Sequence, residues 1–166
     1  MSRPVQNYNE WQTAQHALSY LARIDKLPHR TEGEKALIEQ IPKSIKRVLD
    51  LGTGNGRLIT LLNRFYPGVE AVALDFSDTM LEQAQQQFKN NPSIQTIKHD
   101  LSQPLVYSEL GKFDAVISSL AIHHLEHERK KQLYREIYDL LNPNGIFCNL
   151  DHVSSATPNL HLNFLT

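Results

Sequence analysis

Five short apolar segments recur through the last two-thirds of the chain, and segments with helical periodicity separate them. The apolar segments cover residues 47–52, 69–75, 94–100, 113–119 and 145–153, and the helix-periodic segments cover 56–65, 77–89 and 122–141. Several of the apolar segments are nearly continuous in apolar character, which is typical of strands buried on both faces. Alternation of this kind indicates parallel strands joined by right-handed crossovers. The sequence therefore predicts an α/β fold with an open sheet of five parallel strands flanked by helices.

The length and the charge balance narrow the class of protein further. The 166 residues suit one domain, and the 17 basic residues balance 18 acidic ones, so nothing indicates a nucleic acid or an anionic membrane as partner. The single cysteine, Cys148, excludes an internal disulfide framework and fits a reducing compartment. The longest central run without charged residues or histidine, Ala115 to Ile122, is far too short to span a membrane. No signal segment opens the chain, so we expect a cytoplasmic protein.

The first quarter of the chain has helical patterns of its own. Apolar residues at spacings of three and four predict one helix over about 9–24. Thr31 followed by Glu34 is a capping-box pattern that opens a second helix, and Pro42 closes it. We therefore divide the chain into N-terminal helices over 1–42, which cover a ligand site, and a core over 43–166.

A glycine-rich loop follows the first predicted strand. Three of the seven glycines, Gly52, Gly54 and Gly56, fall within five residues. Clustered glycines allow positive φ and let a ligand approach bare backbone, and the helix that follows adds its unpaired N–H groups. The alternative interpretation is a turn that serves only strand–helix packing.

The next two strands each end in an acid. Asp75 ends the second strand, where a carboxylate can accept hydrogen bonds from both hydroxyls of a ribose. Asp100 ends the third strand, where it can accept a hydrogen bond from an adenine amino group. The alternative for each is a local role, with Asp75 capping a helix, as Ser77 could do equally, and Asp100 capping a loop.

At these residues the sequence resembles the class I S-adenosylmethionine (SAM)-dependent methyltransferases. VLDLGTGNGRLITLL is similar to their first motif, VEAVALDFSDTML to the second and KHDLSQPL to the third, and the resemblance extends over about residues 44–155. It implies a Rossmann-like fold, SAM as cofactor and S-adenosylhomocysteine (SAH) as product. The cofactor-binding residues that we predict on this basis are Arg30, Asp50, Gly52, Thr53, Gly54, Gly56, Asp75, Phe76, Ser77, Met80, Asp100, Leu101 and Ser119.

The resemblance gives several of these residues a part of the cofactor. The glycine loop passes under the methionine part, Asp50 faces the amino group, and Arg30 could pair with the carboxylate. Phe76, Ser77 and Met80 lie beside the adenosine.

The nearest competing class is a nicotinamide-dependent oxidoreductase. Its fingerprint, G-x-G-x-x-G, requires a third glycine five positions after the first, and Arg57 stands there. Asp50 before the loop also suits a cationic sulfonium ligand better than a pyrophosphate. The methyltransferase interpretation is therefore favoured.

The segment after the fourth strand carries the candidate catalytic residue. In the resembling family this segment lines the methyl end of the cofactor, and His123 there could accept a proton from the acceptor. We prefer it to His124, and the alternative is that one histidine packs while the other is solvated. His123 and His127 have metal-ligand spacing, but the sequence places no acid or cysteine to complete a site, so we expect no metal. Asp151 and His152 could face the acceptor pocket or simply be solvated.

The C-terminal end of the chain bears on partners. The family's sheet continues past the fifth strand, whereas this chain stops at Thr166 within a helical pattern, so we expect the C-terminal β-hairpin to be lacking. The fifth strand would then be an uncovered edge, which predicts a homodimer, or another partner, that covers it. We expect a methyltransferase that transfers a methyl group to a small-molecule acceptor by in-line displacement, and the alternative is a non-catalytic SAM-binding module.

Overall fold

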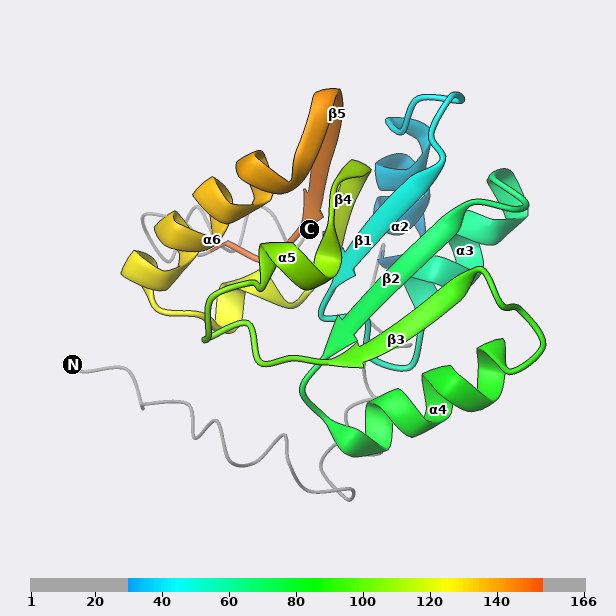
Figure 1. Cartoon of the computed structure of the whole chain (residues 1–166), viewed down its shortest axis with the longest axis horizontal. Coiled ribbons are helices and arrows are strands. Elements are labelled where there is room, and N and C mark those ends of the chain that lie inside the picture. The colour runs from blue at the N-terminus through cyan, green and yellow to red at the C-terminus, as the bar shows by residue number, and fades with distance from the viewer. Residues whose placement is uncertain (1–29, 154–166) are drawn as a thin grey trace, which may run out of the picture.

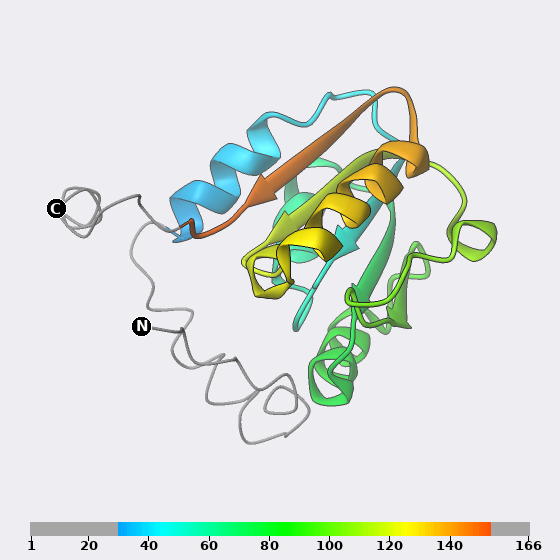
Figure 2. The ribbon, with the colours of Figure 1, turned by 90° about the vertical axis from the view of Figure 1, so that its left-hand side faces the viewer.

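A computed structural model of the protein describes residues 30–153 and shows a parallel sheet between two layers of helices (Figures 1 and 2). The predicted helix over 9–24 and the chain beyond residue 153 lie outside the described residues. In chain order the elements are α2 (Arg30–Glu39), β1 (Arg47–Leu51), α3 (Arg57–Phe65), β2 (Glu70–Asp75), α4 (Asp78–Phe88), β3 (Ile94–Lys98), α5 (Tyr107–Leu110), β4 (Phe113–Ser119), the 3₁₀ helix η2 (Ile122–His124), α6 (His127–Leu140) and β5 (Leu141–Leu150).

The five strands form one sheet in the order β3-β2-β1-β4-β5, and every neighbouring pair is parallel. The chain runs outward from β1 to β2 and β3, then returns past β1 to β4 and β5. The prediction of five parallel strands flanked by helices is confirmed. The reversal of direction next to β1 is the point where sheets of this kind hold ligands, beyond the carboxyl ends of the strands.

Successive side chains of the central strands pack into two separate hydrophobic cores, one on each face of the sheet. Val48 of β1 packs with residues of α2, α3 and α4 on one face of the sheet, whereas its neighbour Leu49 packs with residues of α6 on the other. The side chains of both residues are fully buried. This burial on both faces explains why β1 has no alternating polar pattern.

The structure corrects three boundaries. The predicted helix over 122–141 is divided into η2 and α6, because Leu125 and Glu126 have extended backbone between them. The fifth strand begins earlier than residue 145, since Leu141 already pairs with Phe113 and a bulge follows before the regular register resumes at Ile146. The predicted capping box is wrong, because Thr31 lies inside α2 and the Glu34 side chain is buried elsewhere.

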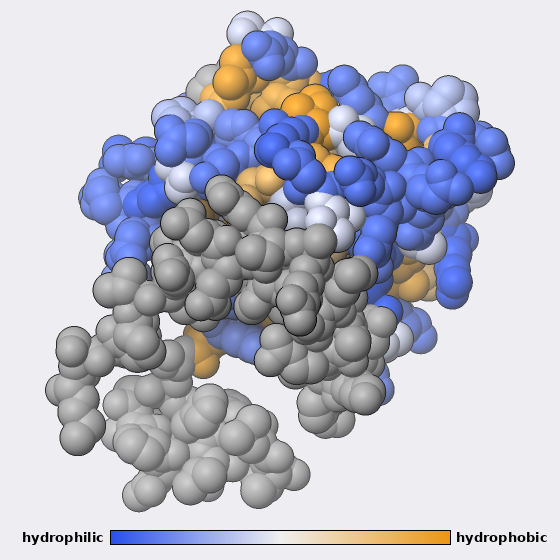
Figure 3. Space-filling view, turned by 90° about the horizontal axis from the view of Figure 1, so that it is seen from below, coloured by the Kyte–Doolittle hydropathy of each residue, from blue (hydrophilic) through white to orange (hydrophobic). Residues whose placement is uncertain are grey.

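Helix α2 lies alongside the edge strand β5, and Leu150 of β5 packs against the core beneath this helix (Figure 2). Seen from below, the described surface is largely hydrophilic, with small separate groups of apolar residues (Figure 3). Within the described range of 30–153, no helix is both long enough and apolar enough to cross a membrane.

Candidate functional site

A cavity lies at the carboxyl end of the sheet, where β1, β2 and β4 end. It holds about 1150 Å³ of empty space, part of it open to solvent. All the residues predicted to bind a cofactor or act in catalysis line it except Gly56 and His123. Those that do are Arg30, Asp50, Gly52, Thr53, Gly54, Asp75, Phe76, Ser77, Met80, Asp100, Leu101 and Ser119. The structure thus brings together residues that are 89 positions apart in the chain, from Arg30 to Ser119.

The glycine loop between β1 and α3 has the backbone conformation that the sequence predicted. Gly52, Gly54 and Gly56 all have positive φ, at 73°, 58° and 86°. A Cβ on Gly52 would lie 2.3 Å from that of Ala121, and one on Gly56 would lie 2.4 Å from the Phe88 ring, whereas Gly54 has open space there. Gly56 therefore serves close packing on α4, while Gly54 presents bare backbone to the cavity.

Asp75, at the end of β2, ties the glycine loop to its neighbouring strand. Its carboxylate accepts a hydrogen bond from the Gly54 N–H at 2.8 Å and another from the Ser77 N–H at 2.9 Å. The side chain is 8% exposed, and burial raises its pKa although these two donors act in the opposite direction. A carboxylate has about four lone-pair positions, so capacity to accept further hydrogen bonds remains.

Asp50, near the end of β1, is the most unusual ionisable group of the site. It is 1% exposed, and its Oδ2 atom has no hydrogen-bond partner among the described residues. Burial raises its pKa from 3.8 to about 7, and the nearby carboxylates of Asp75 and Glu34 also raise it. A buried carboxylate oxygen without a donor fits a cationic ligand group in the cavity.

Glu34 of α2 was not predicted as a site residue, yet it lies in the cavity wall with 1% exposure. It accepts hydrogen bonds from Nε of Arg30 and from Nε of Arg57, both at 2.8 Å. The Ser119 hydroxyl donates to the same carboxylate at 3.3 Å. These contacts join α2, the start of α3 and the end of β4 around the cavity, and they concentrate two guanidinium groups at one end of it.

The opposite side of the cavity is formed by the start of α4 and the loop after β3. Ser77 is the N-cap of α4 and accepts a hydrogen bond from the Met80 N–H at 3.4 Å, so the capping role weighed for Asp75 belongs to Ser77. Asp100 closes a turn by accepting a hydrogen bond from the Ser102 N–H at 2.8 Å. Its side chain is otherwise exposed at the cavity, beside the buried Leu101.

The side chains of the two histidines of η2 lie in different surroundings. His124 lines the cavity, and burial lowers its pKa to about 4, with the adjacent His123 as a further cause, so its ring is neutral at pH 7. His123 is absent from the cavity lining, and its Nδ1 forms a hydrogen bond with the Asp151 carboxylate. The ring centroids of the two histidines are 4.0 Å apart. One residue of register on the 3₁₀ turn decides which of them faces the cavity.

His123 and His127 both lie within the described residues, 30–153. No group of three or more histidine, cysteine, aspartate or glutamate side chains there is arranged to hold a metal ion.

Comparison with known proteins places these features in a family. Residues 48–145 match the family model described as a methyltransferase domain. The chain is 32% identical over 114 residues to a carboxy-S-adenosyl-L-methionine synthase of Campylobacter concisus, covering 68% of this chain and 47% of that protein. It is 35% identical over 122 residues to an uncharacterized methyltransferase of Mycobacterium tuberculosis, covering 72% and 56%. The chain therefore spans about half the length of these relatives.

A solved structure has the same fold. The N-methyltransferase NodS of Bradyrhizobium japonicum, crystallised with SAH, aligns with a TM-score of 0.69 and 18% identity, over 84% of this chain and 71% of that one. The family match covers more than half of this chain, including the glycine loop and all five strands up to the bulge of β5. The chain thus belongs to the class I SAM-dependent methyltransferase family.

Proposed function

We propose that this protein binds SAM in the cavity and transfers its methyl group to a small-molecule acceptor. The observation that carries this proposal is the Asp50 carboxylate, buried and with an unpartnered Oδ2 atom, beneath a glycine loop that presents bare backbone. SAM has both an ammonium and a sulfonium cation at its methionine end. A pyrophosphate, by contrast, would place negative charge next to Asp50, Asp75 and Glu34, which disfavours a nicotinamide dinucleotide.

The charges of the cavity suit a zwitterionic amino acid moiety. Asp50 offers an acceptor for the ammonium group, and Arg30, held by Glu34, offers a donor for the carboxylate. This arrangement supports the predicted assignment of both residues.

The nucleoside part of the ligand fits the other end of the cavity. Asp75 has unused acceptor capacity for the two ribose hydroxyls, and Asp100 exposes its carboxylate for the adenine amino group. Phe76, Met80 and Leu101 supply apolar surface for the base.

SAM, when bound, would supply an electrophilic methyl carbon for in-line displacement by the acceptor nucleophile, with SAH as the leaving group. The chain contributes position and a site for the acceptor's proton. His123 remains our candidate base. A proton on its Nδ1, directed at Asp151, would leave Nε2 able to accept one. His124, which is neutral and in the cavity wall, would contact the ligand without adding charge.

We also propose the class of the acceptor, the cellular location and the oligomeric state of the protein. A formal net charge of −1 supports a small molecule rather than a nucleic acid as acceptor. The single, unpaired Cys148 supports a cytoplasmic location. The position of β5 at the sheet edge supports a homodimer, which light scattering on the purified chain would detect as twice the 19.0 kDa chain mass.

Methyl-labelled SAM tests the proposed reaction directly. The full chain is incubated with pooled phenols, carboxylic acids and amines. Label transferred to the acceptor and the SAH released are both measured for the wild type, for Asp75→Ala and for the control Asp139→Asn, which alters an exposed residue of α6. We expect acceptor-dependent SAH release from the wild type and the control only. SAM binding without release from any pool would instead favour the non-catalytic binding module.

A further inference from the structure

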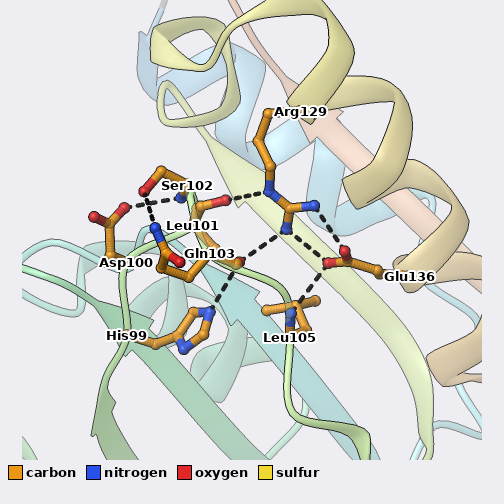
Figure 4. Close-up of polar contacts among 8 residues, drawn as sticks. All are labelled: His99, Asp100, Leu101, Ser102, Gln103, Leu105, Arg129 and Glu136. Atoms are coloured by element: carbon orange, nitrogen blue, oxygen red, sulfur yellow. Dashed lines mark hydrogen bonds and ion pairs between the residues drawn. The ribbon is translucent and has the colours of Figure 1, made fainter.

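A buried ion pair on α6 fastens the loop that carries Asp100 and Leu101 (Figure 4). Arg129 and Glu136 are seven residues apart, which is about two helical turns, so they lie on the same face of the helix. Two hydrogen bonds of 2.7 Å join the guanidinium to the two carboxylate oxygens. The side chains are only 10% and 13% exposed.

Arg129 and Glu136 also form hydrogen bonds with the backbone of the loop between β3 and α5. Arg129 Nε donates to the Leu101 carbonyl at 2.8 Å, and its Nη2 donates to the Gln103 carbonyl at 3.0 Å. Glu136 accepts from the Leu105 N–H at 3.1 Å. Three backbone groups that have no strand partner are therefore bound by two side chains of one helix.

The same loop forms one wall of the cavity. Asp100 and Leu101 line it, and Asp100 accepts a hydrogen bond from the Ser102 N–H, within the segment that the pair holds. The geometry of the Asp100 carboxylate thus depends on the path of residues 101–105.

Anchoring α6 to the sheet does not require this pair. Leu133, Ile137 and Leu140 of the same helix are each at most 2% exposed and belong to the core on that face. Burial raises the pKa of Glu136, but hydrogen bonds from Arg129 and Leu105 outweigh it and leave the pKa below its usual value, so the pair is ionic at neutral pH. A buried ion pair adds little net stability compared with apolar residues, which makes a positioning role the better explanation.

We infer that Arg129 and Glu136 are positioning residues that hold the Asp100–Leu101 loop in the shape that distinguishes adenine from other bases. The inference rests on the proposed function, since it takes Asp100 as the acceptor for the adenine amino group. Arg129 is suited to this task because its planar guanidinium serves two carbonyls and one carboxylate at once, which a lysine cannot do.

The test compares SAH with S-inosylhomocysteine, in which an oxo group replaces the adenine amino group. Dissociation constants are measured by calorimetry for the wild type, Arg129→Lys, Glu136→Gln and the control Arg135→Lys, which alters an exposed arginine of the same helix. We expect the wild type and the control to prefer SAH by at least about tenfold, the worth of one hydrogen bond to a charged group. We expect the preference for SAH to fall to about threefold or less in Arg129→Lys and in Glu136→Gln.

The ratio separates positioning from simple loss of stability, because unfolding would weaken both ligands equally. An unchanged preference for SAH in either Arg129→Lys or Glu136→Gln, when the variant is folded, overturns the inference. If Arg129→Lys fails to fold, Glu136→Gln decides the question, since it keeps the side-chain volume and one acceptor oxygen. A wild type that binds neither ligand contradicts the proposed function, and a wild type that binds both equally contradicts the role of Asp100 and with it the inference.

Discussion

Replacing Asp50 by asparagine should remove a pH dependence of stability that the fold imposes on this carboxyl. The group is 1% exposed, and its pKa rises from 3.8 to about 7 on folding because burial disfavours its charged form. Between these two pH values the folded chain keeps a proton that the unfolded chain has lost. The stabilising contribution is therefore fully present below pH 3.8 and is lost as the pH rises through about 7.

The size of the effect follows from the two pKa values. Each unit of pKa difference corresponds to about 1.4 kcal/mol, so the wild type should lose about 2–3 kcal/mol from this group between pH 5 and pH 8. Asparagine has nearly the same shape and does not titrate. The free energy of unfolding of Asp50→Asn should lack this loss.

Urea unfolding followed by circular dichroism at pH 5, 6, 7 and 8 measures the difference. The control is Asp139→Asn, the same substitution at an exposed aspartate, and its free energy of unfolding should depend on pH as that of the wild type does. Parallel pH profiles for Asp50→Asn and the wild type would refute the reasoning, because they would mean that Asp50 is already ionised in the folded chain.

The same carboxyl should make SAM binding depend on pH. A ligand cation that pairs with Asp50 favours the ionised form, so binding below pH 7 releases a proton. The affinity of the wild type should rise by up to about tenfold per pH unit between pH 5 and pH 7 and then level off. In Asp50→Asn it should be weaker and free of this slope.

Two further substitutions test the packing around the cavity. Glu34→Gln removes the charge that two arginines share and should lower the free energy of unfolding by about 3 kcal/mol. The control Glu39→Gln, in an exposed ion pair on the same helix, should change it by less than about 0.5 kcal/mol. Equal effects of the two substitutions in urea unfolding would contradict the role of Glu34. Gly56→Ala combines a positive φ with a Cβ that meets Phe88, and Gly68→Ala has the positive φ alone. The first should lower the melting temperature distinctly more than the second, whose cost is about 1 kcal/mol; a comparable loss in both would mean that α4 moves aside freely.

The five parallel strands could be predicted from the sequence because burial on both faces leaves a continuous apolar signature. Leu49 and Leu51 carry that signature in β1, and the loop after them has the glycines that its positive φ angles need. The start of β5 could not be predicted. The Asn142–Gly145 segment has the composition of a turn, yet it forms a bulge in which Asn142 donates to the Asp114 side chain from the neighbouring strand.

The cavity residues on the strand ends were predictable for the same reason, since parallel strands bring their carboxyl ends to one edge. Glu34 was not, because Arg57 lies on α3 and only the three-dimensional packing joins it to the Arg30–Glu34 pair of α2. The order of His123 and His124 depends on the phase of a 3₁₀ turn, which hydrophobic periodicity does not record. Arg129 likewise has the sequence context of a solvated helix face.

Calorimetric titration with SAM and SAH tests the central claim most directly. We predict that the wild-type chain binds both ligands, that NADH does not bind, and that Asp75→Ala abolishes SAM and SAH binding while Asp139→Asn retains it. Failure of the folded wild-type chain to bind either SAM or SAH, or an unchanged affinity in Asp75→Ala, would contradict the account.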